Sequence, residues 1–171
     1  MAKKRYKVDI LSASSVEQLK KDMTDYQNKL SDKLHLLCQR LAEIGVETAQ
    51  ANIVSLDAVF TGELFNSIVS EQIVSTKDRS VFLVKSTSEN AIYVEVGTGI
   101  IGAESPYPGK LPVTYAQGKT IRQLSDGRYG WFYQRDGKWY FTEGMPSRPF
   151  MYFTGIELHD KVVGVAKEIF A

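Results

Sequence analysis

The sequence is poor in the residues from which metal sites and many catalytic sites are built. Its 171 residues include a single cysteine, Cys38, and two histidines, His35 and His159. One cysteine excludes an intramolecular disulfide, and Cys38 lies in an apolar helical pattern where a small buried side chain is expected. A structural zinc site needs about four ligands, usually cysteine or histidine, whereas each histidine here is isolated. We therefore predict no metal and no cofactor.

An excess of charge of one sign is also missing. The chain carries 21 Lys and Arg against 20 Asp and Glu, a formal net charge of +1. Proteins that bind nucleic acid through its phosphates usually have a clear basic excess. The basic cluster at residues 3–7 is interpreted as a solubilising terminus, with a phosphate- or partner-binding arm as the alternative.

Long hydrophobic runs are absent. No run approaches the ~20 apolar residues that a membrane span needs. The N-terminal charges are not followed by the apolar segment of a secretory signal. We therefore expect that the protein does not associate with a membrane. We also expect that it is made in a cytoplasm.

Motifs for nucleotide or covalent chemistry are equally scarce. Gly97-Thr98-Gly99 lacks the further glycines, the lysine and the following helix of a phosphate loop. The serines near the N-terminus have no histidine at a spacing that suggests a triad. The carboxylates are scattered, so a small hydrolase with paired acids remains only a rival hypothesis. We predict that the protein is not an enzyme.

The length fits one domain, residues 1–171. An apolar seam predicts one long N-terminal helix, or two helices broken near Asn28–Asp32. Ser14 with Glu17 forms a capping-box pattern, so the helix is expected to begin near Ser14. The seam is expected to pack on the domain's own sheet, with packing between subunits as the alternative. Its residues are Val16, Leu19, Met23, Tyr26, Leu30, Leu34, Leu37, Leu41 and Ile44.

Shorter elements follow. We expect a strand or extended arm at Tyr6–Leu11, and strands at Ile68–Ser75 and Val81–Val84, the last one well buried. Residues 100–118 carry three prolines and three glycines, which is typical of a long surface loop. Helical spacing of apolar residues predicts a C-terminal helix from about Thr154.

An aromatic β-hairpin is predicted at Trp131–Phe141. Asp136-Gly137 between two aromatic runs is a strong turn signal. It pairs Arg135 with Lys138, and the pairing continues outward to Phe132 with Phe141. Both faces are then aromatic, so one should cover the core while the other meets a neighbour or solvent. Aromatic side chains with polar edges suit protein interfaces, which gives the candidate interface residues Tyr107, Tyr115, Trp131, Tyr133, Trp139 and Tyr140.

Glu95 is the carboxylate that stands out. It lies in an otherwise apolar run, Ala91–Val96, and should be partly buried. A buried carboxylate needs a partner or its pKa rises. Arg148, fixed between Pro146 and Pro149, is the expected bidentate partner, with backbone donors as the alternative.

Three phrases read together carry a resemblance. They are TGELFNSI (Thr61–Ile68), AIYVEVGTG (Ala91–Gly99) and GMPSRPFMYFT (Gly144–Thr154). In this order they resemble the tail-completion family, the neck or head–tail connector proteins of long-tailed bacteriophages, also described as minor capsid or tail components. The resemblance covers nearly the whole chain. Its motif positions here are Thr61, Gly62, Glu95, Gly97, Thr98, Arg148, Pro149 and Phe150.

The resemblance implies an α+β domain in which the long N-terminal helix and the C-terminal helix pack on a small antiparallel sheet. It implies a non-enzymatic virion protein at the head–tail junction, made in the host bacterial cytoplasm. The implied partners are further copies of the chain, in a ring that is often a hexamer, and neighbouring neck, connector or tail proteins. DNA would only pass through the channel. A tail-terminator or head-closure role is the nearest alternative, and a nucleic-acid-binding module that uses the hairpin for stacking is a more distant one.

Overall fold

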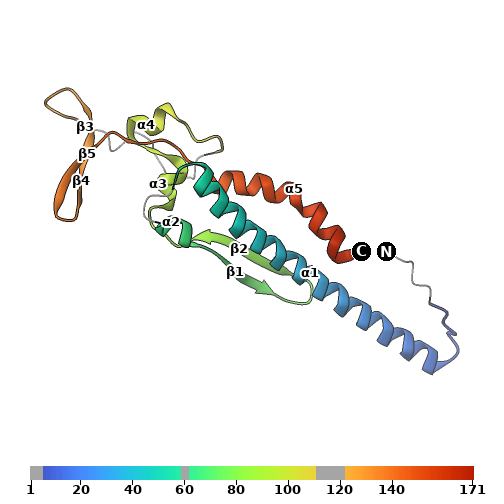
Figure 1. The fold of residues 1–171 in the computed structure, drawn as a ribbon. Coiled ribbons are helices and arrows are strands. Elements are labelled where there is room, and N and C mark those ends of the chain that lie inside the picture. Colours follow the sequence, from blue (N-terminus) through green and yellow to red (C-terminus); the bar gives the residue numbers. More distant parts are fainter. Residues whose placement is uncertain (1–5, 59–61, 111–121) are drawn as a thin grey trace. The chain divides into compact units, whose positions relative to one another are not determined.

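The computed structural model describes residues 6–58, 62–110 and 122–171, and the fold is α+β, as predicted (Figure 1). The chain divides into two compact units. One comprises Met1–Gly45, Ser70–Val84 and Leu158–Ala171, and the other comprises Val46–Val69 and Lys85–Glu157. Whether the chain forms one domain stays a prediction. In chain order the elements are α1 (Ala13–Ser55), α2 (Glu63–Asn66), β1 (Ile68–Ser75), β2 (Ser80–Ser86), α3 (Ala91–Val96), α4 (Gly99–Glu104), β3 (Arg122–Gln123), β4 (Tyr129–Arg135), β5 (Lys138–Thr142), β6 (Gly144–Met145) and α5 (Phe150–Phe170).

Helix α1 is continuous over 43 residues, about 65 Å at 1.5 Å per residue. The single long helix is confirmed, and the alternative of a break near Asn28–Asp32 is wrong. The segment holds neither glycine nor proline, and the Ser31 hydroxyl donates to the Lys77 carbonyl at 2.8 Å instead of capping a second helix. The start near Ser14 is confirmed, but Ser12 serves as the cap, because its Oγ accepts from the Ser15 N–H at 3.4 Å. Residues 6–11 form no strand.

In the first unit, the β1–β2 hairpin lies along the middle of α1 (Figure 1). His35 Nδ1 and Ser80 Oγ are 3.2 Å apart, and the His35 and Phe82 rings meet edge to face. The bounds of β1 match the prediction, but β2 is half-buried, not well buried. The hairpin turns Phe82 toward the helix, whereas Leu83 on the opposite side is exposed.

The core of the second unit gathers the ends of three helices. Ile53 of α1, Val96 of α3 and Phe150 of α5 are almost fully buried. The expected surface loop is helical at its beginning, where α4 forms, and residues 111–118 of it lie outside the described residues. Helix α5 begins at Phe150, four residues before the predicted start.

The aromatic hairpin has the predicted register, and β3 extends it to a three-stranded sheet. Arg135 pairs with Lys138 and Phe132 with Phe141. Asp136 and Gly137 both have positive φ, 52° and 73°, as a two-residue hairpin turn requires.

Candidate functional site

Two of the three sequence phrases lie side by side. An antiparallel bridge joins Thr98 to Met145 and Gly99 to Gly144. Further along, the Arg148 N–H donates to the Val94 carbonyl at 2.9 Å, and Ser147 Oγ donates to the Glu95 carbonyl at 2.7 Å. The second and third phrases therefore form one backbone-bonded scaffold, although about 50 residues separate them in the chain.

Gly97 permits this close approach. Its φ of 74° and ψ of 166° belong to a region open almost only to glycine. A Cβ built on Gly97 would lie 2.6 Å from the Ser147 nitrogen. The contact shows why glycine is needed at this motif position.

The Glu95 carboxylate lies at the N-terminus of α5. Its side chain is 7% exposed, and its two oxygens accept from the backbone N–H groups of Met151 and Tyr152, each at 2.9 Å. The first N–H groups of a helix have no partner within the helix, and the helix dipole favours a negative charge beside them. Glu95 thus caps α5 from a distant part of the chain.

Burial raises the pKa of the Glu95 carboxyl above its usual value, although the helix N–H groups and a hydrogen bond with Tyr107 act in the opposite direction. Burial and the neighbouring carboxylate also raise the pKa of the Tyr107 hydroxyl. The Tyr107 ring packs edge to face on Tyr152, with centroids 5.6 Å apart. Tyr107 is half-buried and supports the Glu95 carboxylate, and its place at an interface stays a prediction.

Arg148 does not serve as the predicted bidentate partner of Glu95. Its Nε donates to the Leu56 carbonyl at 3.1 Å, at the end of α1. The expectation of backbone donors for Glu95 is the one that holds. Pro149 and Phe150 follow Arg148 into the core, where Phe150 is 1% exposed. Arg148 therefore ties the third phrase to α1.

The first phrase is placed by other contacts. Gly62 precedes α2 with a φ of 75°, whereas Thr61 lies outside the described residues. Gln50 of α1 donates to the Phe65 carbonyl at 3.2 Å. The buried Ser67 hydroxyl lies 2.7 Å from Ser86 Oγ, at the end of β2.

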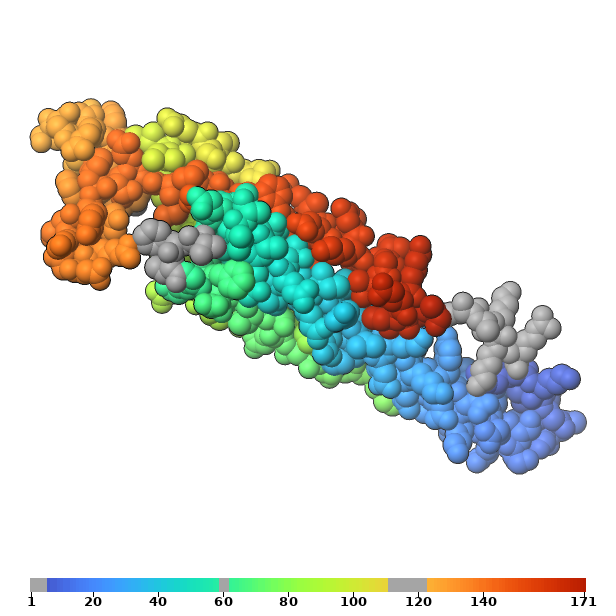
Figure 2. All heavy atoms as spheres, viewed as in Figure 1, coloured from blue at the N-terminus to red at the C-terminus, as the bar shows by residue number. Residues whose placement is uncertain are grey.

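The aromatic hairpin is exposed on both faces, so the expectation that one face covers the core is wrong. Trp139 is 67% and Phe132 is 51% exposed on one side. On the other, Tyr133 and Tyr140 stack with centroids 5.7 Å apart and remain exposed, while Trp131 is half-buried. In the space-filling view the orange atoms of β4 and β5 lie at the surface (Figure 2). Tyr115 lies outside the described residues.

Asn52 is a contact residue that the sequence reading missed. Its Nδ2 donates to Thr154 Oγ1 and to Glu157 Oε1, both at 3.2 Å, and so joins α1 to α5. The available signal was a polar side chain directly before the apolar Ile53, which is buried.

Among residues 6–58, 62–110 and 122–171, no group of three or more His, Cys, Asp or Glu side chains is arranged to hold a metal. Within the same ranges, no helix is both long enough and apolar enough to cross a membrane. The carboxylate of Glu95 is engaged by helix N–H groups.

Comparison with protein-family models, curated proteins and solved structures finds no match to this chain.

Proposed function

We propose that this protein is a non-enzymatic structural component of a bacteriophage virion. It acts at the head–tail junction, where copies of the chain form a ring that joins the tail to the neck. Its partners are further copies of itself and the neighbouring neck, connector or tail proteins. The proposal rests on the resemblance carried by the three phrases.

The observation that best supports an assembly role is the exposed aromatic hairpin. Soluble proteins rarely leave several large aromatic side chains open on both faces of one strand pair, and such patches commonly mark protein interfaces. Tryptophan and tyrosine contribute strongly at interfaces because they bury a large apolar surface and still offer a polar atom. Trp139, exposed by two thirds, is the strongest anchor on this surface.

The test is genetic complementation combined with electron microscopy. Deletion of the gene from the phage or prophage that carries it should leave filled heads and free tails that are not joined. The wild-type gene supplied in trans should restore joined particles, and Trp139→Ala should not. Trp139→Ala should keep the wild-type circular dichroism spectrum and thermal midpoint, because the side chain it removes is largely solvated.

Lys138→Ala is the matched control on the same hairpin. Its side chain is also exposed, but it lacks aromatic surface, and we expect it to restore joined particles. Joined, infectious particles in the absence of the gene would refute the proposed function. Full complementation by Trp139→Ala would remove the hairpin as the interface.

A further inference from the structure

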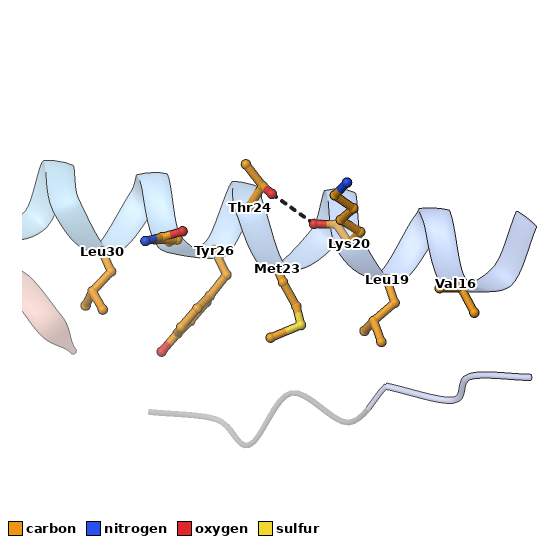
Figure 3. Close-up of a pocket in the computed structure, with 8 residues that line it drawn as sticks. Val16, Leu19, Lys20, Met23, Thr24, Tyr26 and Leu30 are labelled. Carbon is orange, nitrogen blue, oxygen red and sulfur yellow. Dashed lines mark hydrogen bonds between the residues drawn. The ribbon is translucent and has the colours of Figure 1, made fainter. Parts of the chain in front are cut away.

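The first half of α1 carries an apolar stripe whose side chains are exposed, except for the half-buried Leu19. Its apolar side chains project from one side of the helix (Figure 3), and Met23 and Tyr26 at its centre are 59% and 53% exposed. The blue atoms of these turns lie at the surface in Figure 2. The stripe consists of Val16, Leu19, Met23, Tyr26 and Leu30, which line a shallow hollow.

The spacing of this stripe is that of a two-helix seam. Its residues follow each other at steps of three, four, three and four, so that they occupy the a and d positions of a heptad, with Val16 at a. The pattern stops at Lys33, which takes the next d position. The apolar residue moves to Leu34, and from there the seam is half-buried within the unit. Among the described residues of α1, the segment from Val16 to Leu30 therefore combines the heptad pattern with mostly exposed apolar side chains.

We infer that the stripe is a self-association surface, on which the same stripe of a second copy lies antiparallel. In an antiparallel pair, a positions face d positions. Met23 then meets Tyr26 of the second copy twice at the centre, and Leu19 meets Leu30 twice outside it. The four layers are related by one two-fold axis between Met23 and Tyr26, which gives a closed, symmetric dimer.

Charge favours a second copy and fixes its direction. Residues 13–30 contain three lysines and three acidic residues, so two stripes approach without net repulsion. The g positions beside the seam are Asp22 and Lys29. In the antiparallel pair each Asp22 faces Lys29 of the other copy, which is the pairing that flanking charges use to set orientation. In a parallel pair Asp22 would face the neutral Gln27.

The contact is small. Eighteen residues of helix span about 27 Å, and a single helix pair of this length falls in the class below about 1,200 Å² of buried surface, which is typical of weak complexes. We therefore expect a reversible dimer that forms in the micromolar to millimolar range. This inference does not depend on the proposed function.

Sedimentation of the full chain across that concentration range provides the test. The wild type should shift from 19.2 kDa toward twice that mass. Asp22→Lys and Lys29→Asp alone place like charges opposite each other, and each should weaken the dimer by about tenfold or more. An equimolar mixture of these two variants should associate again, because one variant then presents a lysine at both g positions and the other presents an aspartate at both.

Lys21→Asp with Asp25→Lys is the matched control. It reverses two charges on the outer side of the same helix and should leave the dimer unchanged. Met23→Glu should abolish the dimer and keep the helical circular dichroism signal. A wild type that stays at 19.2 kDa throughout would overturn the inference. Self-association that is as strong in the Asp22 and Lys29 variants as in the wild type would also overturn it. A ring formed through another surface would give that result.

Discussion

Replacement of Glu95 tests whether the capping of α5 from a distant segment stabilises the fold. Glu95→Ala removes the acceptor for the Met151 and Tyr152 N–H groups, both of which lie 2.9 Å from its oxygens. The change also leaves those N–H groups in a largely closed site. Glu95→Gln keeps the shape and one good acceptor oxygen, but turns an NH₂ group toward a second donor.

The magnitude follows from the two hydrogen bonds. A hydrogen bond to a charged group contributes about 1.5–3 kcal/mol, and a buried donor without a partner costs about 1–3 kcal/mol. Burial of the carboxylate offsets part of this contribution, as the raised pKa of Glu95 shows. We expect Glu95→Ala to lower the free energy of unfolding by about 2–4 kcal/mol and Glu95→Gln by about 1–2 kcal/mol.

Urea unfolding followed by circular dichroism measures the free energy, and amide hydrogen exchange at Met151 and Tyr152 reports the cap directly. Both amides should exchange faster in Glu95→Ala. Glu89→Gln, a change at an exposed glutamate, should alter stability by less than about 0.5 kcal/mol. If the unfolding free energy of Glu95→Ala lies within about 0.5 kcal/mol of the wild-type value, the capping argument fails.

The raised pKa of Glu95 also sets a pH dependence. A group whose pKa is higher in the folded state binds its proton more tightly there, so its contribution to stability is greatest at low pH. That contribution is lost as the pH rises from the usual carboxyl value of 4.5 through the raised one. The difference in unfolding free energy between wild type and Glu95→Gln should therefore grow as the pH falls through this window. A difference that shrinks would contradict the direction of the shift.

Two further substitutions test the scaffold. Gly97→Ala should destabilise the protein by more than about 2 kcal/mol, because its backbone conformation is closed to other residues and a Cβ there meets the Ser147 nitrogen. Gly127→Ala, at a similar φ of 84° with nothing within 4 Å, should cost only about 1 kcal/mol, and equal thermal shifts for the two variants would argue against the close contact. Asn52→Ala should cost about 1–2 kcal/mol through the lost bonds to α5, and an unchanged unfolding midpoint would show that these bonds contribute little.

Local signals in the sequence predict the local structure well. Asp136-Gly137 predicts the hairpin register because a two-residue turn leaves one way to pair the flanking strands. The β1 boundaries follow in the same way from a short pattern. The predicted break in α1 failed because polar residues such as Asn28 and Asp32 disfavour a helix only weakly, and packing overrides such a preference.

The contacts of the candidate site depend on the fold. Glu95 was expected to need a partner, but the sequence left Arg148 and unspecified backbone donors both open, and the donors observed lie more than 50 residues away. The exposure of both faces of the aromatic hairpin also depends on the fold. Alternation shows that both faces are aromatic, but only the fold shows that neither face meets the core.

The bridge between Thr98–Gly99 and Gly144–Met145 has a consequence for how this chain tolerates change in length. The Ile100 N–H donates to the Glu143 carbonyl at 3.0 Å, so the segment between them leaves the scaffold and returns to it at one point. Once the ends of a loop are held together, each doubling of its length costs only about 0.6 kcal/mol in closure entropy. The exposed turn at Gly127, inside this segment, is therefore a natural position for insertions and for grafted tags, since added residues there leave the paired ends in place.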